Sequence, residues 1–520
     1  MTRTDLVSQV RDVLLVDPEP FREQVRADAE AIMSAIEEGV FDNPQAIIGL
    51  EYEFYAVSRG PDPNVAGGSD EPLGSLQRVP RRLLNFIRFE KELGLHNAEL
   101  STSPLPLNSD GLRAQEATVA AQLRTANQCV RREGLVLVSD GIWTIPTQGE
   151  TACDYLTDSA EIDGVHIASN LSKSARYHAM ANADCEVTPA LELDAPHVSL
   201  SAQTTMPESL ITSIQPHYQV PRAQTLPERF RYALRVAGPL LALGVNSPLF
   251  PPDLYDDVPP ADILADARMS NRIGTFESVL NSRSGSGKVR FPRDIASVQE
   301  AVDRIVDDDL LIPMPVDPDQ EYGAFQAKHG TYWRWVRPVF GGASGSRANA
   351  RIEFRPIAAQ PTVRDTIAFQ AAFAGLMEGL PQANHPVSEL DWQVAHDNFY
   401  DAAADGLDAT LRWITGSGTE TTETNEIFAD IFEYAAEGLR SCGLSEETIG
   451  RYIGPLRRRV RHDLSPAGWK LQQVQQALDD GASFEEAVSA MQRQYIRRQS
   501  ETLLESDFGA WIEDYSYRVR

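Results

Sequence analysis

The chain has 520 residues, of which 42% are hydrophobic and 8% aromatic, so it can bury a sizeable core and is not disordered as a whole. Its 75 acidic and 47 basic residues give a net charge of −28, which opposes binding to nucleic acid and to anionic membranes. No run approaches the ~18 consecutive apolar residues of a membrane span. Because acids interrupt the N-terminal stretch, we expect no secretory signal and a cytoplasmic protein.

The basic residues are mostly arginine, and lysine is scarce. The surface that this composition predicts is acidic and poor in lysine. In a salt-rich cytoplasm, strong screening weakens the repulsion among such like charges. We therefore expect a halophilic host.

The first predicted elements are a helical segment over 1–38 and, after a break at Asn43-Pro44, a strand over 46–57. This strand is the best in the chain, because it is rich in β-branched and aromatic residues. Helices are then predicted at 111–133, about 227–243 and from 362 to about 380, and strands at 135–138, 192–203, 331–340 and 350–357. The stretch 251–325 is predicted to be rich in loops.

From residue 388 onward the periodicity is helical, with few strand signals. We therefore predict an N-terminal helical segment (1–45), a mixed α+β core (46–386) and a helical C-terminal extension (387–520). One basic island, residues 455–461, stands out in this acidic chain. We interpret it as a helix face that pairs with acidic neighbours, and a nucleotide or partner contact is the alternative.

Two carboxylates lie in the middle of the predicted strand 46–57. Glu51 and Glu53 are two residues apart, so they point to one face of the strand, where their repulsion must be neutralised. A divalent cation fits this need, since Mg²⁺ prefers oxygen ligands and often bridges carboxylates to phosphate. The alternative is an edge strand whose acidic face lies in water.

A second charged pattern occurs in the stretch 351–355, where charged side chains alternate with apolar ones. Glu353 and Arg355 therefore share a face, and the neighbouring predicted strand brings Arg337. Such a face can hold a metal through the carboxylate and phosphoryl oxygens through the guanidinium groups. A cross-strand ladder of ion pairs, each worth under about 1 kcal/mol, is the alternative.

Two further segments fit the same kind of site. Glu99 precedes a Ser/Thr/Pro turn, and His197 lies in a predicted strand where it shares a face with Ser199 and Ser201. A lone histidine is more often a core residue than a ligand. His197 is a candidate ligand because the acid-bearing segments need the same ion.

Five short motifs occur in order along the chain. They are Gly49-x-Glu51-x-Glu53, Glu99-Leu-Ser-Thr-Ser-Pro, the strand around His197, Leu243-Gly-Val-Asn246-Ser247-Pro248 and Glu353-Phe-Arg355. This ordered set resembles the glutamate–cysteine ligase and carboxylate–amine ligase family, which belongs to the glutamine synthetase superfamily. The resemblance covers residues 46–380, and the chain departs from the family in the 251–325 region and in its helical extension.

The resemblance implies an α+β fold with a glutamine synthetase-like curved, mainly antiparallel sheet flanked by helices. Its concave face would bind the cofactors ATP and Mg²⁺ or Mn²⁺. The implied metal ligands are Glu51, His197 and Glu353 at one site and Glu53 and Glu99 at a second. The implied catalytic and ATP-contacting residues are Arg337 and Arg355, and the implied substrate-binding residues are Asn246, Arg268 and Arg272.

The implied activity is ligation of a carboxylate to an amine through an acyl phosphate, as in glutathione biosynthesis. The acid is expected to be glutamate, through its γ-carboxyl group, and cysteine is the acceptor that the family suggests. The partners would be small molecules, and a homo-oligomer is left open. The alternatives are a ligase for another acid and amine, and a catalytically silent relative that acts as a binding or regulatory module.

Overall fold

A computed structural model describes residues 3–60, 73–183, 191–281, 287–314, 316, 320–342 and 347–512. Its centre is a seven-stranded antiparallel sheet with the order β10-β11-β9-β1-β2, in which β3 and β4 pair with the two ends of β1. The strands are β1 (Ile47–Ser58), β2 (Asn97–Ser101), β3 (Leu105–Pro106), β4 (Leu135–Val138), β9 (Ile214–Gln219), β10 (Val336–Gly341) and β11 (Asn349–Phe354). The predicted α+β class with a mainly antiparallel sheet is confirmed.

β1 is the strand to which the other parts of the sheet attach. Leu50, Tyr52 and Phe54 are at most 2% exposed and face a layer of helices. Glu51 and Glu53 alternate with them and point to the opposite face. Because β9 pairs with one side of β1 and β2 with the other, β1 is an interior strand, and the alternative of an acidic edge strand is wrong.

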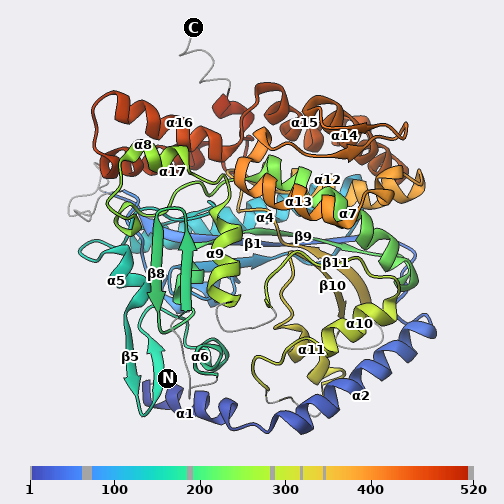
Figure 1. The fold of residues 1–520 in the computed structure, drawn as a ribbon, viewed down its shortest axis with the longest axis horizontal. Coiled ribbons are helices and arrows are strands. Elements are labelled where there is room, and N and C mark those ends of the chain that lie inside the picture. Colours follow the sequence, from blue (N-terminus) through green and yellow to red (C-terminus); the bar gives the residue numbers. More distant parts are fainter. Residues whose placement is uncertain are drawn as a thin grey trace.

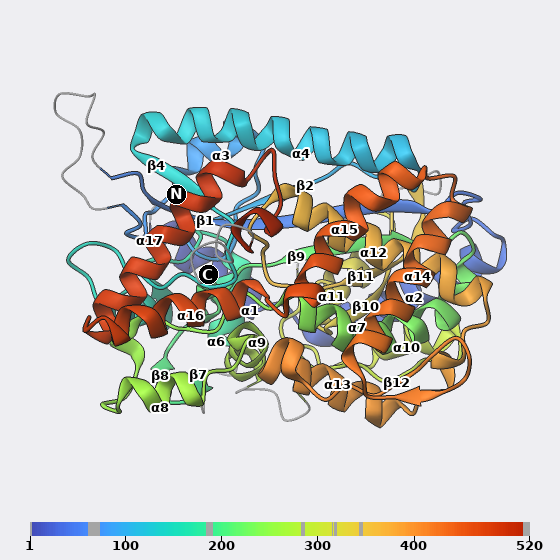
Figure 2. The ribbon, with the colours of Figure 1, turned by 90° about the horizontal axis from the view of Figure 1, so that it is seen from above.

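Helices cover one face of the sheet (Figure 1). Tyr52 points to this face, since its hydroxyl contacts Thr366 of α12. α12 lies on the sheet beside α4 and α7, and α14 and α15 pack over α12 (Figure 1, Figure 2). The helices of this side are α4 (Ser109–Val130), α7 (Leu226–Gly244), α12 (Val363–Gln382), α13 (Trp392–Asp405), α14 (Thr424–Ser441), α15 (Glu446–His462), α16 (Pro466–Asp479) and α17 (Phe484–Thr502). None of the helices in the described ranges combines the length and the apolar composition that a membrane span requires.

The opposite face of the sheet is bordered by shorter elements and by the N-terminal helices (Figure 1). The helices there are α1 (Arg3–Leu14), α2 (Pro18–Glu37), α6 (Ala175–Asn182), α9 (Asn271–Asn281), α10 (Val298–Val306) and α11 (Gly323–His329). The hairpins are β5–β6 (Ser159–Ile162 and Val165–Ala168) and β7–β8 (Leu191–Ala195 and Val198–Ala202). The remaining short elements are α3 (Arg81–Ile87), α5 (Ala152–Thr157), α8 (Pro260–Ala265) and the pair β12–β13 (Trp413–Ile414 and Glu420–Thr421).

Several predicted elements differ from the observed ones. The predicted helix 1–38 is two helices, because Asp17 caps α2 and Pro18 occupies its first turn. The predicted strand 192–203 is the β7–β8 hairpin, whose turn contains His197 at φ +60°. The predicted strand 331–340 begins only at Val336, and the region expected to be rich in loops contains α8, α9, α10 and the start of α11.

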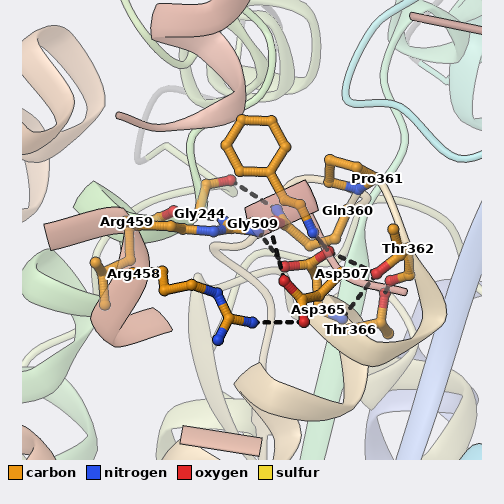
Figure 3. Close-up of polar contacts among 12 residues, drawn as sticks. Gly244, Gln360, Pro361, Thr362, Asp365, Thr366, Arg458, Arg459, Asp507 and Gly509 are labelled. Atoms are coloured by element: carbon orange, nitrogen blue, oxygen red, sulfur yellow. Dashed lines mark hydrogen bonds and ion pairs between the residues drawn. The ribbon is translucent and has the colours of Figure 1, made fainter. Parts of the chain in front are cut away.

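Buried polar contacts join the C-terminal helices to the rest of the fold (Figure 3). Arg459 of α15 donates hydrogen bonds of 2.8 Å to Asp365 Oδ1 and to Gln360 Oε1. From α17, Gln499 donates to the carbonyl of Ser139 over 2.6 Å. The C-terminal region is helical as predicted, and the division of the chain at 386 stays a prediction.

Candidate active site

The face of the sheet opposite the C-terminal helices carries polar side chains in cross-strand register. Glu53 of β1 lies opposite Glu99 of β2. His217 of β9 lies opposite Glu353 of β11, which in turn lies opposite Arg337 of β10. Strand pairing therefore brings acids, a histidine and an arginine from distant parts of the chain onto one surface.

Glu353 is held by an arginine on either side. Arg337 binds it through two parallel hydrogen bonds of 2.9 Å, from Nε to Oε1 and from Nη2 to Oε2, and Arg355 Nη1 also donates to Oε1. Burial alone would raise the pKa of Glu353, but Arg337 and Arg355 hold this pKa well below its usual range. The cross-strand ion pairs that the sequence offered as an alternative are thus formed.

Glu51 faces a histidine that differs from the predicted one. Its Oε1 lies 3.4 Å from His217 Nε2, and His217 Nδ1 accepts a hydrogen bond of 3.1 Å from Arg351 Nε. Burial would raise the pKa of Glu51, but the nearby His217 lowers it below its usual value. Glu51 is therefore an ionised carboxylate at neutral pH.

Glu53 is a buried carboxylate with mainly neutral hydrogen-bond donors. The Ser213 amide donates to Oε2 over 2.7 Å, and Gln215 Nε2 donates to Oε1 over 2.9 Å. Burial and the neighbouring Glu92 raise the pKa of Glu53 to about 7. These donors orient the carboxylate without neutralising it.

Glu99 and Glu208 show the same effect. Burial, followed by Glu92, raises the pKa of Glu99 well above its usual value and that of Glu208 to about 8. Glu53, Glu92 and Glu208 also line one cavity of about 40 Å³, together with Arg272. A cation bound among these neighbouring carboxylates would stabilise their ionised form.

Arg272 faces these carboxylates from the first turn of α9. It is 3% exposed, and its Nη1 donates to the Arg355 carbonyl over 2.9 Å. Its guanidinium also lies over the Trp335 ring, 5.2 Å from the ring centre. Burial lowers the pKa of Arg272 to about 10 despite the opposing effect of Glu53, so the group stays charged at neutral pH. The structure thus brings this predicted substrate-binding residue to the acidic cavity.

The structure does not bring His197 to this face. It lies in the turn of the β7–β8 hairpin, which is a separate two-stranded sheet, and its Nε2 forms a hydrogen bond of 2.8 Å with Asp266 Oδ2. The alternation over 192–203 suggested one strand, whereas Pro196 and His197 reverse the chain. His217 takes the place beside Glu51 that was expected for His197.

Asn246 and Arg268 also differ from their predicted positions. Asn246 is fully buried on the helical side of the sheet, where its amide donates to the Ala359 carbonyl over 2.7 Å and to the Tyr495 hydroxyl over 3.0 Å. In the structure this amide holds backbone, and its role in substrate binding stays a prediction. Arg268 is exposed between α8 and α9 and does not line the acidic cavity.

Sequence reasoning missed several residues of the site, namely Glu92, Glu208, Gln215 and His217. The alternation of Gln215, His217 and Gln219 could have indicated the polar face of β9, but Pro216 between them argues against an interior strand. β9 accommodates the proline because its pairing with β11 begins only at His217. Glu92 and Glu208 lie in a loop and in a 3₁₀ helix, where no periodicity indicates which way a side chain points.

Several buried polar atoms of this face have no hydrogen-bond partner within the described part of the chain. They are Gln215 Oε1, Arg272 Nε and Arg355 Nε. Because an unpaired buried polar atom is costly, this clustering indicates a surface that a ligand completes. In the ranges that the structure describes, no three His, Cys, Asp or Glu side chains are already grouped as a metal site. The donors nevertheless fit Mg²⁺ in kind, since Glu51, Glu53 and Glu99 offer hard oxygen ligands.

The antiparallel sheet and its surrounding helices form a carboxylate–amine ligase fold. A sequence model of glutamate-cysteine ligase family 2 (GCS2) matches residues 47–502, which is most of the chain. The chain belongs to this family. Because the match continues to residue 502, the resemblance that was noted over 46–380 was too short, and the helices up to α17 are not a departure from the family.

Three solved structures are similar to the chain at low sequence identity. The glutamate–cysteine ligase of Francisella tularensis in complex with AMP has a TM-score of 0.51 and 13% identity, covering 92% of this chain and 93% of that chain. A bifunctional glutathione synthetase from Pasteurella multocida has a TM-score of 0.49 and 12% identity, covering 91% and 55%. The complex of the prokaryotic ubiquitin-like protein Pup with its ligase PafA has a TM-score of 0.37 and 12% identity, covering 86% and 71%. No curated protein sequence matches the chain.

Proposed function

We propose that the protein is an ATP- and Mg²⁺-dependent ligase that joins the γ-carboxyl group of glutamate to an amine, with cysteine as the first acceptor to test. Membership of glutamate-cysteine ligase family 2 supports the reaction class. The AMP bound in the Francisella tularensis enzyme supports the use of an adenine nucleotide. The expected partners are therefore amino acids and ATP.

One observation carries the proposal. Glu51, Glu53 and Glu99 share a single face of the sheet with Arg355, and Arg272 closes the same face from α9. Carboxylates that repel one another lie there beside guanidinium groups with unpaired buried nitrogens. Such a surface suits a metal–polyphosphate complex and a substrate carboxylate, since it offers both oxygen ligands and anion-binding forks.

The proposed reaction has two steps. The γ-carboxylate oxygen attacks the γ-phosphorus of ATP, which forms an acyl phosphate and releases ADP. The amine nitrogen then attacks the acyl carbon, the C–O bond to phosphate breaks, and the amide and inorganic phosphate leave. Negative oxygens crowd together during the first step, so positioning and charge neutralisation are the main tasks of the protein.

The residues of the face divide these tasks. Glu51, Glu53 and Glu99, with His217, would hold Mg²⁺, which when bound neutralises phosphate oxygens. Arg355 and Arg272 are placed to bind phosphoryl or carboxylate oxygens. Glu353 fixes Arg355 and Arg337 in place through the ion pairs described above.

Within the cavity lined by Glu53, Glu92 and Glu208, the carboxylates attract the ammonium group of an incoming amine. The amine must lose a proton before it attacks, and a carboxylate with a raised pKa is suited to accept it. Leu93, Ile211 and Phe276 give the same cavity an apolar wall.

A phosphate-release assay tests the proposal, with ATP, Mg²⁺, glutamate and a panel of amines that includes cysteine. We expect turnover that requires ATP, the acid and an amine together, and mass spectrometry should identify the γ-glutamyl amide. Turnover with a different acid or amine would support the proposed reaction class but show that the proposed substrate pair is wrong. Mg·ATP binding without turnover on any pair, or no binding at all, would instead indicate a catalytically silent relative.

A further inference from the structure

One arginine of the basic island 455–461 is unlike its neighbours. Arg459 is 0% exposed, whereas Arg457 and Arg461 on the same helix, α15, are exposed. The island was interpreted above as a helix face that pairs with acidic neighbours, and Arg459 does pair with an acid, Asp365. This pair is buried, because the Arg459 side chain points into the fold (Figure 3).

The Arg459 guanidinium connects separate parts of the chain. Nη1 donates to the Leu243 carbonyl over 2.7 Å and to Gln360 Oε1 over 2.8 Å, and Nη2 donates to Asp365 Oδ1 over 2.8 Å (Figure 3). Asp365 is fully buried and also accepts a hydrogen bond from the Phe508 amide over 2.8 Å. The planar fork of the guanidinium makes this geometry possible, because it donates to several acceptors at fixed angles.

Gln360 carries these contacts from α15 to the sheet. Its Nε2 donates to the carbonyls of Gly244 and Ala358, each over 2.8 Å. Its own carbonyl accepts hydrogen bonds from the hydroxyls of Tyr52, at 3.3 Å, and Ser139. Tyr52 lies on β1 between the two predicted metal ligands of that strand, so the contact reaches the back of the site.

The segment 355–360 links Gln360 to the site along the backbone. It begins at Arg355 and runs beside the start of β9, where the Ala359 amide donates to the Thr212 carbonyl over 3.1 Å. Ser213, which follows Thr212 in the chain, donates its amide hydrogen to Glu53 Oε2 over 2.7 Å. A shift of the 355–360 segment would therefore move Arg355 directly and Glu53 through its hydrogen-bond donor.

We propose that Arg459 is a positioning residue for the candidate active site, which through Gln360 fixes the segment between β11 and α12 and so sets the positions of Arg355 and Glu53. The inference rests on the proposed function for its activity readout. A residue that only attached α15 to the fold would need the contacts to Leu243 and Asp365, whereas the contact to Gln360 is the one that continues toward the site.

The main test is Arg459→Lys, with the exposed Arg461→Lys on the same helix as the matched control. A lysine keeps the buried charge for Asp365 but cannot also hold Gln360 and Leu243 in the planar arrangement. Below the melting temperature of each variant, we expect kcat of Arg459→Lys to fall about 10- to 100-fold with little change in KM, because a small misplacement of reacting groups has effects of this size. The control should keep the wild-type kcat.

A second variant protects the test against a folding defect. Arg459→Met combined with Asp365→Asn removes the ion pair without leaving a buried charge unpaired. Hydrogen–deuterium exchange of residues 211–216 and 353–360 is then measured in both variants. We expect faster exchange in both segments, and this readout does not depend on catalysis.

The outcomes separate the inference from the proposed function. A lower melting temperature with unchanged kcat and unchanged exchange in 211–216 would show that Arg459 only attaches α15, and would overturn the inference. If the wild type itself shows no turnover with any substrate pair, the proposed function fails and the exchange data alone decide. Faster exchange in 211–216 would then support the inference, and unchanged exchange would refute it.

Discussion

The two faces of the central sheet both bury charge, but they do so in different ways. On the helical side the Arg459–Asp365 and Lys470–Asp140 pairs are balanced, and none of their side chains is more than 1% exposed. On the opposite side, burial and neighbouring like charges together raise the pKa of carboxylates such as Glu53. Balanced pairs belong to a scaffold that the chain completes alone, whereas unbalanced charge indicates a surface that needs a ligand. The predictions below test this difference, in order of decreasing effect.

Glu53→Gln should have the largest effect, on the unbalanced face. We expect the rate of phosphate release to fall about 100- to 1,000-fold, as for the loss of a group that stabilises charge in the transition state. The melting temperature without Mg²⁺ should stay the same or rise, because a repelled carboxylate is removed. Glu505→Gln, at an exposed position, is the control. Wild-type turnover in Glu53→Gln would remove Glu53 from the site.

Lys470→Met tests the balanced face. Lys470 Nζ donates to Asp140 Oδ1 and, over 2.9 Å, to the Asn246 carbonyl, and loss of the ammonium leaves a buried carboxylate without its cation. We expect the free energy of unfolding to fall by about 3 kcal/mol. Denaturant titration measures this change, with the exposed Lys91→Met as the control. A variant as stable as the wild type would mean that Asp140 does not depend on Lys470 for its charge balance.

Arg355→Lys should reduce activity less than loss of Glu53 does. The lysine keeps the positive charge beside Glu353 but not the planar fork that binds two oxygens at once. We expect kcat/KM to fall about 10- to 100-fold, since the lysine still neutralises the bound anion but no longer holds it in the correct position. Steady-state kinetics over a range of ATP and glutamate concentrations measure the effect. Unchanged kcat/KM would exclude a bidentate role for Arg355.

The stability of the metal-free protein should depend on pH in a definite direction. The pKa of Glu53 is raised to about 7 and that of Glu208 to about 8, so the folded chain binds more protons than the unfolded chain between the ordinary glutamate pKa and these values. The free energy of unfolding should therefore fall as the pH rises through this window, by about 1.4 kcal/mol for each unit by which a pKa is raised. Thermal melts at a series of pH values measure this, and Glu208→Gln should flatten the profile. A rise in stability over the same window would contradict the raised pKa values.

Salt should produce the smallest and most general effect. The net charge of −28 creates repulsion over the surface, which molar KCl screens, whereas buried pairs are screened much less. We expect the melting temperature of the wild type to rise with KCl. The melting temperature of Lys470→Met should rise by a similar amount. Full stability without added salt would argue against a halophilic host.

Much of the fold could be predicted from the sequence, because its main elements have strong periodicity. β1, α4, β4, α7 and α12 were expected within a few residues of their observed bounds. Alternation on β1 also placed its two acids on one face without any structural information. The prediction failed where the pattern does not show that the chain reverses. At Pro196-His197 a turn divides an otherwise continuous alternation into the two strands of a hairpin.

The candidate site was only partly predictable, for a different physical reason. Residues on strands could be assigned to a face, so Glu53, Glu99 and Glu353 were found together. His217 was missed because Pro216 interrupts the polar alternation of the strand that carries it. For Asn246, a motif alone does not say whether an amide binds a ligand or, as the structure shows, donates to backbone. Long-range pairing, which sets these positions, is not encoded in local spacing.

The position of α17 has a consequence for how the chain is made. Gln499 donates to the Ser139 carbonyl, and the Val363 amide donates to the Leu503 carbonyl over 2.9 Å, so residues near the end of the chain close the back of a sheet that begins at residue 47. During synthesis the ribosome must therefore release the chain as far as residue 503 before this sheet is fully enclosed. Nascent chains would expose apolar strand surface in the meantime, and such a topology, dominated by contacts between distant residues, is expected to fold slowly.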